Sequence, residues 1–138
     1  LKTKKLSNIY FYGFISPKMI GNFQNSFDMV LAPYTNKVSV FGNSGNSSKY
    51  MSPLKIFEYM SYKKAIISTD LPVLREVLNN KNSILVDAQN INEWVNAINR
   101  LRNQEIREKI SENAFKDFKN YSWKYRAFKI INSYEADI

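Results

Sequence analysis

The sequence predicts an α/β domain built on a parallel sheet, and three observations support this class. Short apolar runs rich in Ile, Val, Phe and Tyr alternate with helical patterns along the chain. The clearest helical pattern starts at Ile91 and places apolar residues at the i, i+3, i+4 and i+7 spacing of an amphipathic helix. At 138 residues and 44% hydrophobic composition, the chain suits one domain with a core of its own. Because crossover helices cover both faces of a parallel sheet, this alternation favours the parallel arrangement.

Four runs have the length and the β-branched or aromatic content of buried strands. They are Ile9–Ile15, Met29–Pro33, Ala65–Thr69 and Ser83–Val86. Helices are predicted over Pro17–Ser26, Ser52–Lys63, Pro72–Asn79, Ile91–Arg102, Glu105–Lys119 and Trp123–Glu135. Asp70 is expected to cap the helix that follows it.

One connection is unusually long. Residues 35–51 are rich in Asn, Ser and Gly and show little periodicity. We predict a flexible loop here, because a connection of more than about 12–15 residues in a compact domain is commonly functional or disordered. This loop leads directly into the helix that is predicted to begin at Ser52.

Composition excludes several kinds of chemistry. With no Cys and no His, disulfides, thiolate metal sites and a histidine base are ruled out. Catalysis would therefore depend on carboxylates, Lys, Tyr or backbone dipoles. No apolar run approaches the roughly 20 residues that cross a bilayer, so a cytoplasmic location is expected.

The net charge of +8 is uneven along the chain. Residues 1–64 contain nine lysines and only two acidic residues, Asp28 and Glu58. Such a field favours an anionic ligand, which includes phosphate esters, nucleic acid and an acidic membrane surface. The alternative is a lysine-rich composition that serves solubility alone.

The segment SPLKIFEYM has the pattern of a helix start that binds an anion. Ser52 suits the N-cap, and Pro53 suits the first helical position, where its missing N–H is harmless. The free backbone amides of Leu54 and Lys55 would then lie at the positive end of the helix dipole. Lys55 in this first turn is unfavourable for the dipole unless an anion is bound nearby.

Glu58 lies further along the same helix and can point to the same side as Leu54 and Lys55. An ionised carboxylate only accepts hydrogen bonds, so its natural partner beside a diphosphate is a pair of vicinal hydroxyls, as on ribose. The alternative is an ordinary surface ion pair with Lys55, three positions earlier.

The order of the motifs resembles the C-terminal, donor-binding domain of the retaining group 1 glycosyltransferases with the GT-B fold. The motifs are NIYFYGFI, SFDMVLAPY, SPLKIFEYM, KAIISTDLPVLREV, NSILVD, the Ile91 helix and YSW. The resemblance runs from Asn8 to Tyr134. It implies a partial Rossmann-like sheet of about four strands, a nucleotide-sugar substrate, and no cofactor or required metal.

The resemblance also implies site residues. Glu58 matches the ligand of the ribose hydroxyls, and Tyr50 stands where the family has a first glutamate that contacts the donor sugar. Glu76 matches a family glutamate near the sugar, although a solvated residue paired with Arg75 or Lys81 is the alternative. No catalytic residue is assigned. The donor-binding residues implied in this way are Gly13, Phe14, Ile15, Tyr34, Tyr50, Ser52, Pro53, Leu54, Lys55 and Glu58.

By the same resemblance, 1–138 is a single, incomplete domain, inactive alone, because two strand–helix units and the acceptor domain would precede Leu1. In the strand order 3-2-1-4-5-6 those two strands would separate the Ile9 strand from the Met29 strand. We therefore expect the Ile9 strand to be displaced, differently paired or the least secure element. The apolar residues of the terminal helix are expected to lie partly exposed, with core packing as the alternative. These residues are Trp123, Tyr125, Phe128 and Ile131.

The expected function is donor binding in a hexosyltransferase of bacterial surface polysaccharide synthesis, acting on a glycan or a lipid-linked acceptor. The expected partners are the nucleotide-sugar, the acceptor domain of the same chain and the inner membrane surface. Nucleic acid is not expected, because the basic residues are dispersed. A nucleic-acid binder and a non-catalytic α/β interaction module are the alternatives.

Overall fold

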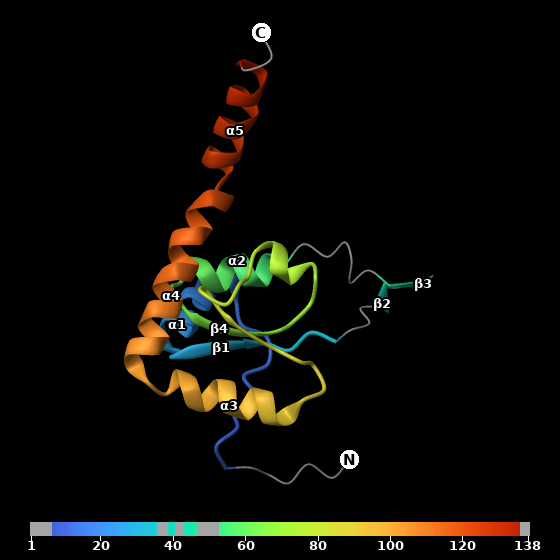
Figure 1. Ribbon diagram of the computed structural model, residues 1–138. Helices are drawn as coiled ribbons and strands as arrows, with labels where there is room; N and C mark the ends of the chain where they lie inside the picture. Colours follow the sequence, from blue (N-terminus) through green and yellow to red (C-terminus); the bar gives the residue numbers. More distant parts are fainter. Residues whose placement is uncertain (1–6, 36–38, 41–42, 47–52, 136–138) are drawn as a thin grey trace.

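The computed structural model describes residues 7–35, 39–40, 43–46 and 53–135. Its main sheet has three parallel strands, β1 (Met29–Ala32), β4 (Ala65–Thr69) and β5 (Ile84–Val86), in the order β1-β4-β5. The predicted α/β class is therefore confirmed, and helices flank the sheet on both faces (Figure 1).

Strand β4 occupies the centre of the sheet, and all five of its residues are buried. Ile66 lies opposite Val30 of β1, and Ile67 lies opposite Ile84 of β5. Because successive strand side chains point to opposite faces, Ile66 and Ile67 belong to two different cores. A strand covered on both faces reads as a continuous apolar run, which is why AIIST is recognisable in the sequence.

Helix α2 (Leu54–Ser61) covers one face of the sheet and α3 (Ile91–Leu101) covers the other (Figure 1). Helix α4 (Gln104–Phe118) runs past both, since its Ala114 joins the α2 core and its Ile110 joins the α3 core. The short 3-10 helices η2 (Leu74–Glu76) and η3 (Lys119–Tyr121) complete this part of the fold.

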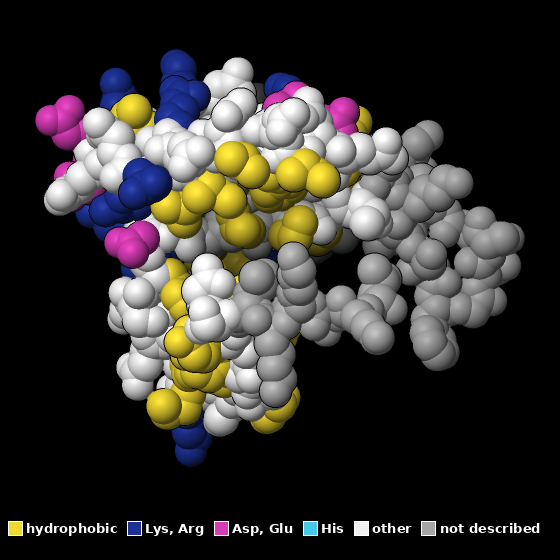
Figure 2. All heavy atoms as spheres, turned by 90° about the horizontal axis from the view of Figure 1, so that it is seen from below, with side chains coloured by type: hydrophobic (Ala, Val, Ile, Leu, Met, Phe, Trp, Pro, Cys, Tyr) yellow, Lys and Arg dark blue, Asp and Glu magenta, His cyan; other side chains and the backbone are white. Residues whose placement is uncertain are grey.

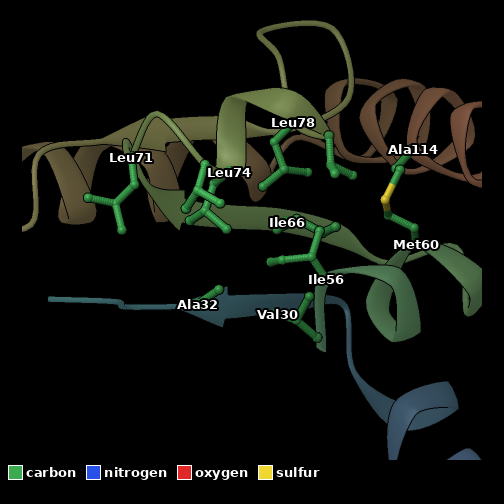
Figure 3. Packing of buried hydrophobic residues seen from close by; sticks show 11 residues of the cluster. Val30, Ala32, Ile56, Met60, Ile66, Leu71, Leu74, Leu78 and Ala114 are labelled. Atoms are coloured by element: carbon green, nitrogen blue, oxygen red, sulfur yellow. The ribbon is translucent and has the colours of Figure 1, made fainter. Parts of the chain in front are cut away.

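The larger core lies between α2, the sheet and the segment around η2 (Figure 3). Ile56 and Met60 of α2, which are four residues apart, point into it together, and Met60 extends toward Ala114. Ile56, Met60, Ile66 and Leu74 are completely buried. Each such side chain stabilises the fold by about 1.5–3 kcal/mol relative to exposure.

The end of α2 carries a Schellman motif. Lys63 has the left-handed φ of 54°, and its amide donates to the Met60 carbonyl at 3.1 Å. The Lys64 amide donates to the Tyr59 carbonyl at 3.2 Å. These two bonds satisfy carbonyls that the helix leaves unpaired, and they turn the chain sharply into β4.

Helix α1 (Pro17–Ser26) is attached to the end of α2 by Lys64 and Tyr62. The Lys64 ammonium donates to the carbonyls of Asn25 at 3.2 Å and Phe27 at 2.9 Å. A Cβ on Gly21 would lie 3.1 Å from the Tyr62 hydroxyl, so glycine permits this close approach. A cation at a helix C-terminus also opposes the negative end of the dipole.

The predicted strand over Ile9–Ile15 is wrong. These residues form neither helix nor strand, and Phe11 and Phe14 are 95% and 91% exposed. A strand requires a hydrogen-bonded neighbour, and no described strand pairs with this segment. Instead, the Tyr12 ring packs edge-on against Phe23 of α1, with ring centroids 5.1 Å apart.

Two further predictions need correction. The helix expected over Pro72–Asn79 is only the three-residue η2, and Asp70 binds the Arg75 guanidinium instead of capping it. Within the segment 35–51, whose flexibility stays a prediction, the structure describes a small antiparallel pair, β2 (Ser39–Val40) with β3 (Asn43–Asn46). The ion pair with Arg75 or Lys81, which was the alternative interpretation of Glu76, is absent from the described residues.

Helix α5 (Trp123–Glu135) extends away from the sheet and its helices (Figure 1). Trp123 is 83% exposed, and Phe128 and Ile131 are also exposed, whereas Tyr125 is half-buried. The expectation that this helix leaves its apolar residues partly exposed is confirmed. Within the described ranges, no helix has the length and apolarity required to cross a membrane.

Hydrophobic side chains also reach the surface on the face where α3 is the nearest helix (Figure 2). Ile91, Val95 and Ile98 of α3 are all exposed, and so is Leu31 of β1. The core on the α3 side of the sheet therefore continues into apolar surface.

Candidate functional site

A surface pocket of about 310 Å³ lies where the N-terminal segment and α1 meet α2. Most of its wall is aromatic or aliphatic, and its polar groups come from Lys55, Glu58 and Gln24. The residues that line it are Tyr12, Ile15, Ile20, Phe23, Gln24, Phe27, Lys55, Glu58 and Tyr59.

The start of α2 lies toward the carboxyl ends of the strands, because α2 returns the chain from the end of β1 to the start of parallel β4. The structure places the N-cap at the buried Pro53, whose ψ of 62° is not helical, so the prediction of Pro53 as the first helical residue is wrong. The first intrahelical bond runs from the Ile56 amide to the Pro53 carbonyl at 2.9 Å. Within the described ranges, the amides of Leu54 and Lys55 have no hydrogen-bond partner. These two donors can therefore bind an anion.

Glu58 is half-buried in the second turn of α2, and its side chain faces the pocket. Its carboxylate makes no hydrogen bond or ion pair with any residue that the structure describes. The surface ion pair with Lys55, which was the alternative role for Glu58, is therefore not formed. The carboxylate keeps its full capacity to accept hydrogen bonds from a ligand.

Tyr59 follows Glu58 and forms part of the same wall. Burial raises the pKa of Tyr59, and the neighbouring Tyr34 and Glu58 raise it further. Burial also raises the pKa of Tyr34. Both phenols therefore stay protonated at neutral pH, and the Tyr59 hydroxyl is available to donate a hydrogen bond.

Gln24 of α1 is 7% exposed and contributes to the pocket wall. Its side-chain oxygen Oε1 has no hydrogen-bond partner, and it is the one buried side-chain N or O atom of the described chain in this condition. Buried polar groups are almost always hydrogen-bonded, so an unpaired buried amide oxygen requires an explanation.

The pocket brings together three of the residues that were predicted for the site, namely Ile15, Lys55 and Glu58. Gly13, Phe14 and Tyr34 do not line it. Gly13 has a φ of +66° at the surface, and Phe14 points into solvent. Tyr34 packs against the α2 core, and its carbonyl accepts a hydrogen bond from Thr69 Oγ1 at 2.8 Å.

The remaining predicted residues lie at or before the start of α2. Pro53 is buried at the N-cap, and the Leu54 side chain is 74% exposed. Only the backbone amide of Leu54 is therefore suited to a ligand. Tyr50 and Ser52 lie outside the described residues.

Sequence reasoning did not identify the α1 wall of the pocket. Ile20, Phe23 and Phe27 have the i, i+3 and i+7 spacing of an apolar helix face, and Gln24 falls on this same face. The sequence signal that could have identified this wall was therefore Gln24, a polar residue within an apolar stripe.

A second hollow lies at the carboxyl ends of β4 and β5, lined by Asp70, Leu85, Asp87, Ala88 and Glu93. Its acidic groups already have partners. The Arg75 hydrogen bond lowers the pKa of Asp70, and Glu93 Oε2 accepts from the Asp87 amide at 2.8 Å. No group of three or more potential ligand residues in the described ranges is arranged to hold a metal ion.

Comparison with known proteins agrees with the fold. A family model described as glycosyl transferases group 1 matches residues 1–104 of the 138. No match was found among curated proteins. The matched region contains the three-stranded parallel sheet, α1 and α2, and hence every residue of the pocket. The chain therefore belongs to the group 1 glycosyl transferases.

Proposed function

We propose that this chain binds the nucleotide-sugar donor of a glycosyl transfer reaction in the pocket between α1 and α2. The main supporting observation is that, among the described residues, neither the Glu58 carboxylate nor the amides of Leu54 and Lys55 have a partner, and that Glu58 and Lys55 line one pocket. In this proposal Glu58 accepts hydrogen bonds from the two ribose hydroxyls.

The diphosphate would bind at the start of α2. The Leu54 and Lys55 amides point out of the positive end of the helix dipole, and the Lys55 ammonium adds a full charge. Lys55 opposes the dipole in the absence of a ligand, whereas a bound diphosphate makes the same residue favourable. Amides and ammonium together compensate the diphosphate charge, so this arrangement needs no metal ion.

The same groups would assist the reaction. When the sugar leaves the nucleotide, negative charge grows on the diphosphate, and preorganised donors aimed at it stabilise the transition state. Glu58 would hold the ribose and thereby orient the sugar–phosphate bond. In the proposed enzyme, the acceptor comes from a separate domain, so donor binding is the contribution of this one.

We further propose a hexose donor and a glycan or lipid-linked acceptor in surface polysaccharide synthesis, at the cytoplasmic face of a membrane. The net charge of +8 supports this location, because basic proteins are attracted to anionic lipid surfaces.

Isothermal titration calorimetry with UDP, GDP, ADP and CDP tests the proposed donor site. Glu58→Gln keeps the shape but removes the charge, and it should weaken the tightest of these ligands by about 1–3 kcal/mol, the range for hydrogen bonds to a charged group. The matched control is Glu105→Gln, which changes an exposed carboxylate in the first turn of α4, outside the pocket. Equal affinity of Glu58→Gln and the unmodified protein would contradict the proposed role.

A further inference from the structure

Gln24 is a polar side chain in a place where the fold does not use its polarity. It lies on the apolar face of α1 and is 7% exposed, and its Oε1 is unpaired. In the absence of a ligand, this costs stability, because a buried acceptor without a donor keeps its desolvation penalty. Gln24 also lines the pocket, and although Oε1 itself is buried, a ligand there would supply the missing donor once the side chain turns toward it.

The position of Gln24 is well defined by the surrounding structure. The Lys64 ammonium binds the carbonyls of Asn25 and Phe27, which follow Gln24 in the sequence. On the other side of Gln24, Gly21 lies against Tyr62 at the end of α2. Gln24 is therefore held at the wall of the pocket that Glu58 also lines, as specific recognition requires.

We propose that Gln24 selects the base of the nucleotide donor, and that it favours bases with a ring N–H beside a carbonyl oxygen. Uracil and thymine have this edge without an exocyclic amine beside it. This inference rests on the proposed function: if Glu58 holds the ribose, the base attached to that ribose occupies the rest of the same pocket. The Tyr12, Phe23 and Phe27 side chains then provide the apolar walls that a base requires.

The preference follows from counting hydrogen-bond donors and acceptors. A glutamine amide offers one acceptor oxygen and one N–H₂ group, so it pairs with a ring N–H and the adjacent carbonyl. The ring N–H carries a single hydrogen, which Gln24 Oε1 satisfies completely. Adenine and cytosine present an exocyclic amine with two hydrogens instead, and guanine carries such an amine directly beside its ring N–H. The second hydrogen would be buried against largely apolar walls, where an unpaired donor is costly.

Titration of the protein with UDP, GDP, ADP, CDP and inorganic pyrophosphate tests this inference. UDP should bind at least about tenfold more tightly than GDP, ADP and CDP, the factor for one well-made hydrogen bond. Gln24→Met, which is similar in size but apolar, should reduce this preference to about threefold or less. Its pyrophosphate affinity should stay unchanged. Asn22→Met, on the exposed side of α1, is the matched control and should keep the preference.

Thermal unfolding without ligand separates a recognition role from a structural one. Gln24→Met removes an unpaired polar atom, so its melting temperature should equal or exceed that of the unmodified protein. A lower melting temperature would indicate that Gln24 stabilises the fold, and would contradict the inference. If Gln24→Met does not fold, Gln24→Asn decides the matter, because its shorter amide should lose the same preference.

The possible failures are distinguishable. If Glu58→Gln weakens nucleotide binding but Gln24→Met keeps the base preference, Gln24 does not select the base and the donor site stands. A preference for GDP, ADP or CDP in the unmodified protein would likewise overturn the role of Gln24 and leave the donor site standing. If no nucleoside diphosphate binds, both the donor site and the role of Gln24 are wrong.

Discussion

The attachment of α1 by Lys64 determines one wall of the pocket, and Lys64→Met isolates its contribution. The substitution keeps the aliphatic part of the side chain and removes both hydrogen bonds from the ammonium, to Asn25 O at 3.2 Å and Phe27 O at 2.9 Å. We expect α1 to loosen from the end of α2 and the pocket to lose part of its shape.

The expected loss follows from the two contacts. A hydrogen bond to a charged group contributes about 1.5–3 kcal/mol, but Lys64 is partly solvated, so water replaces some of each bond. The favourable interaction of the ammonium with the helix C-terminus adds about 0.3–1 kcal/mol. Allowing for solvation, Lys64→Met should lower the free energy of unfolding by roughly 1–3 kcal/mol.

Urea denaturation followed by circular dichroism measures this change. The matched control is Lys63→Met, because Lys63 is adjacent and exposed, and its one ion pair, with Glu112 at 3.7 Å, lies at the surface. That control should lose no more than about 1 kcal/mol. Equal denaturation midpoints for the two variants would refute the reasoning, since they would show that the ammonium does not hold α1.

Two further predictions concern stability. Lys63→Gly should raise the free energy of unfolding by up to about 1 kcal/mol, because glycine adopts the left-handed φ of 54° without the Cβ clash; a lower urea midpoint would count against the Schellman geometry. Asp70→Asn should be slightly destabilising at pH 7, because the Arg75 hydrogen bond lowers the pKa of Asp70 below its usual 3.8. This stabilisation is present above pH 3.8 and is lost as the pH falls through the lower folded-state pKa, so unfolding curves of the two proteins should converge in acid. A difference that persists in strong acid would require another cause.

Local pattern predicted most of the helices and strands. Pro17–Ser26 and Trp123–Glu135 were expected as helices and have these bounds in the structure. Strand β4 was likewise expected with its observed bounds. The predictions for these segments are correct because they rest on apolar periodicity, proline position or β-branched content, which act within a few residues of the chain.

The incorrect secondary-structure predictions concern segments whose structure depends on residues distant in the sequence. Ile9–Ile15 has the composition of a strand, but a strand exists only when a neighbour accepts and donates its hydrogen bonds. In residues 72–79, the side chains of Val73, Leu74, Val77 and Leu78 are buried in the core. A single 3-10 turn is enough to bury them, so no longer helix forms. Propensity alone does not distinguish these outcomes.

The sequence by itself determined the parallel α/β class, and it predicted an anion-binding start of α2 and roles for Lys55 and Glu58, because each depends on residues close together in the chain. Only the tertiary structure decided that Glu58 has no partner among the described residues and that Ile15 and Gln24 share its pocket. The physical reason is that α1 and α2 lie almost thirty residues apart in sequence and meet through Lys64, Gly21 and Tyr62. Such contacts depend on how the whole chain packs, and no local spacing encodes them.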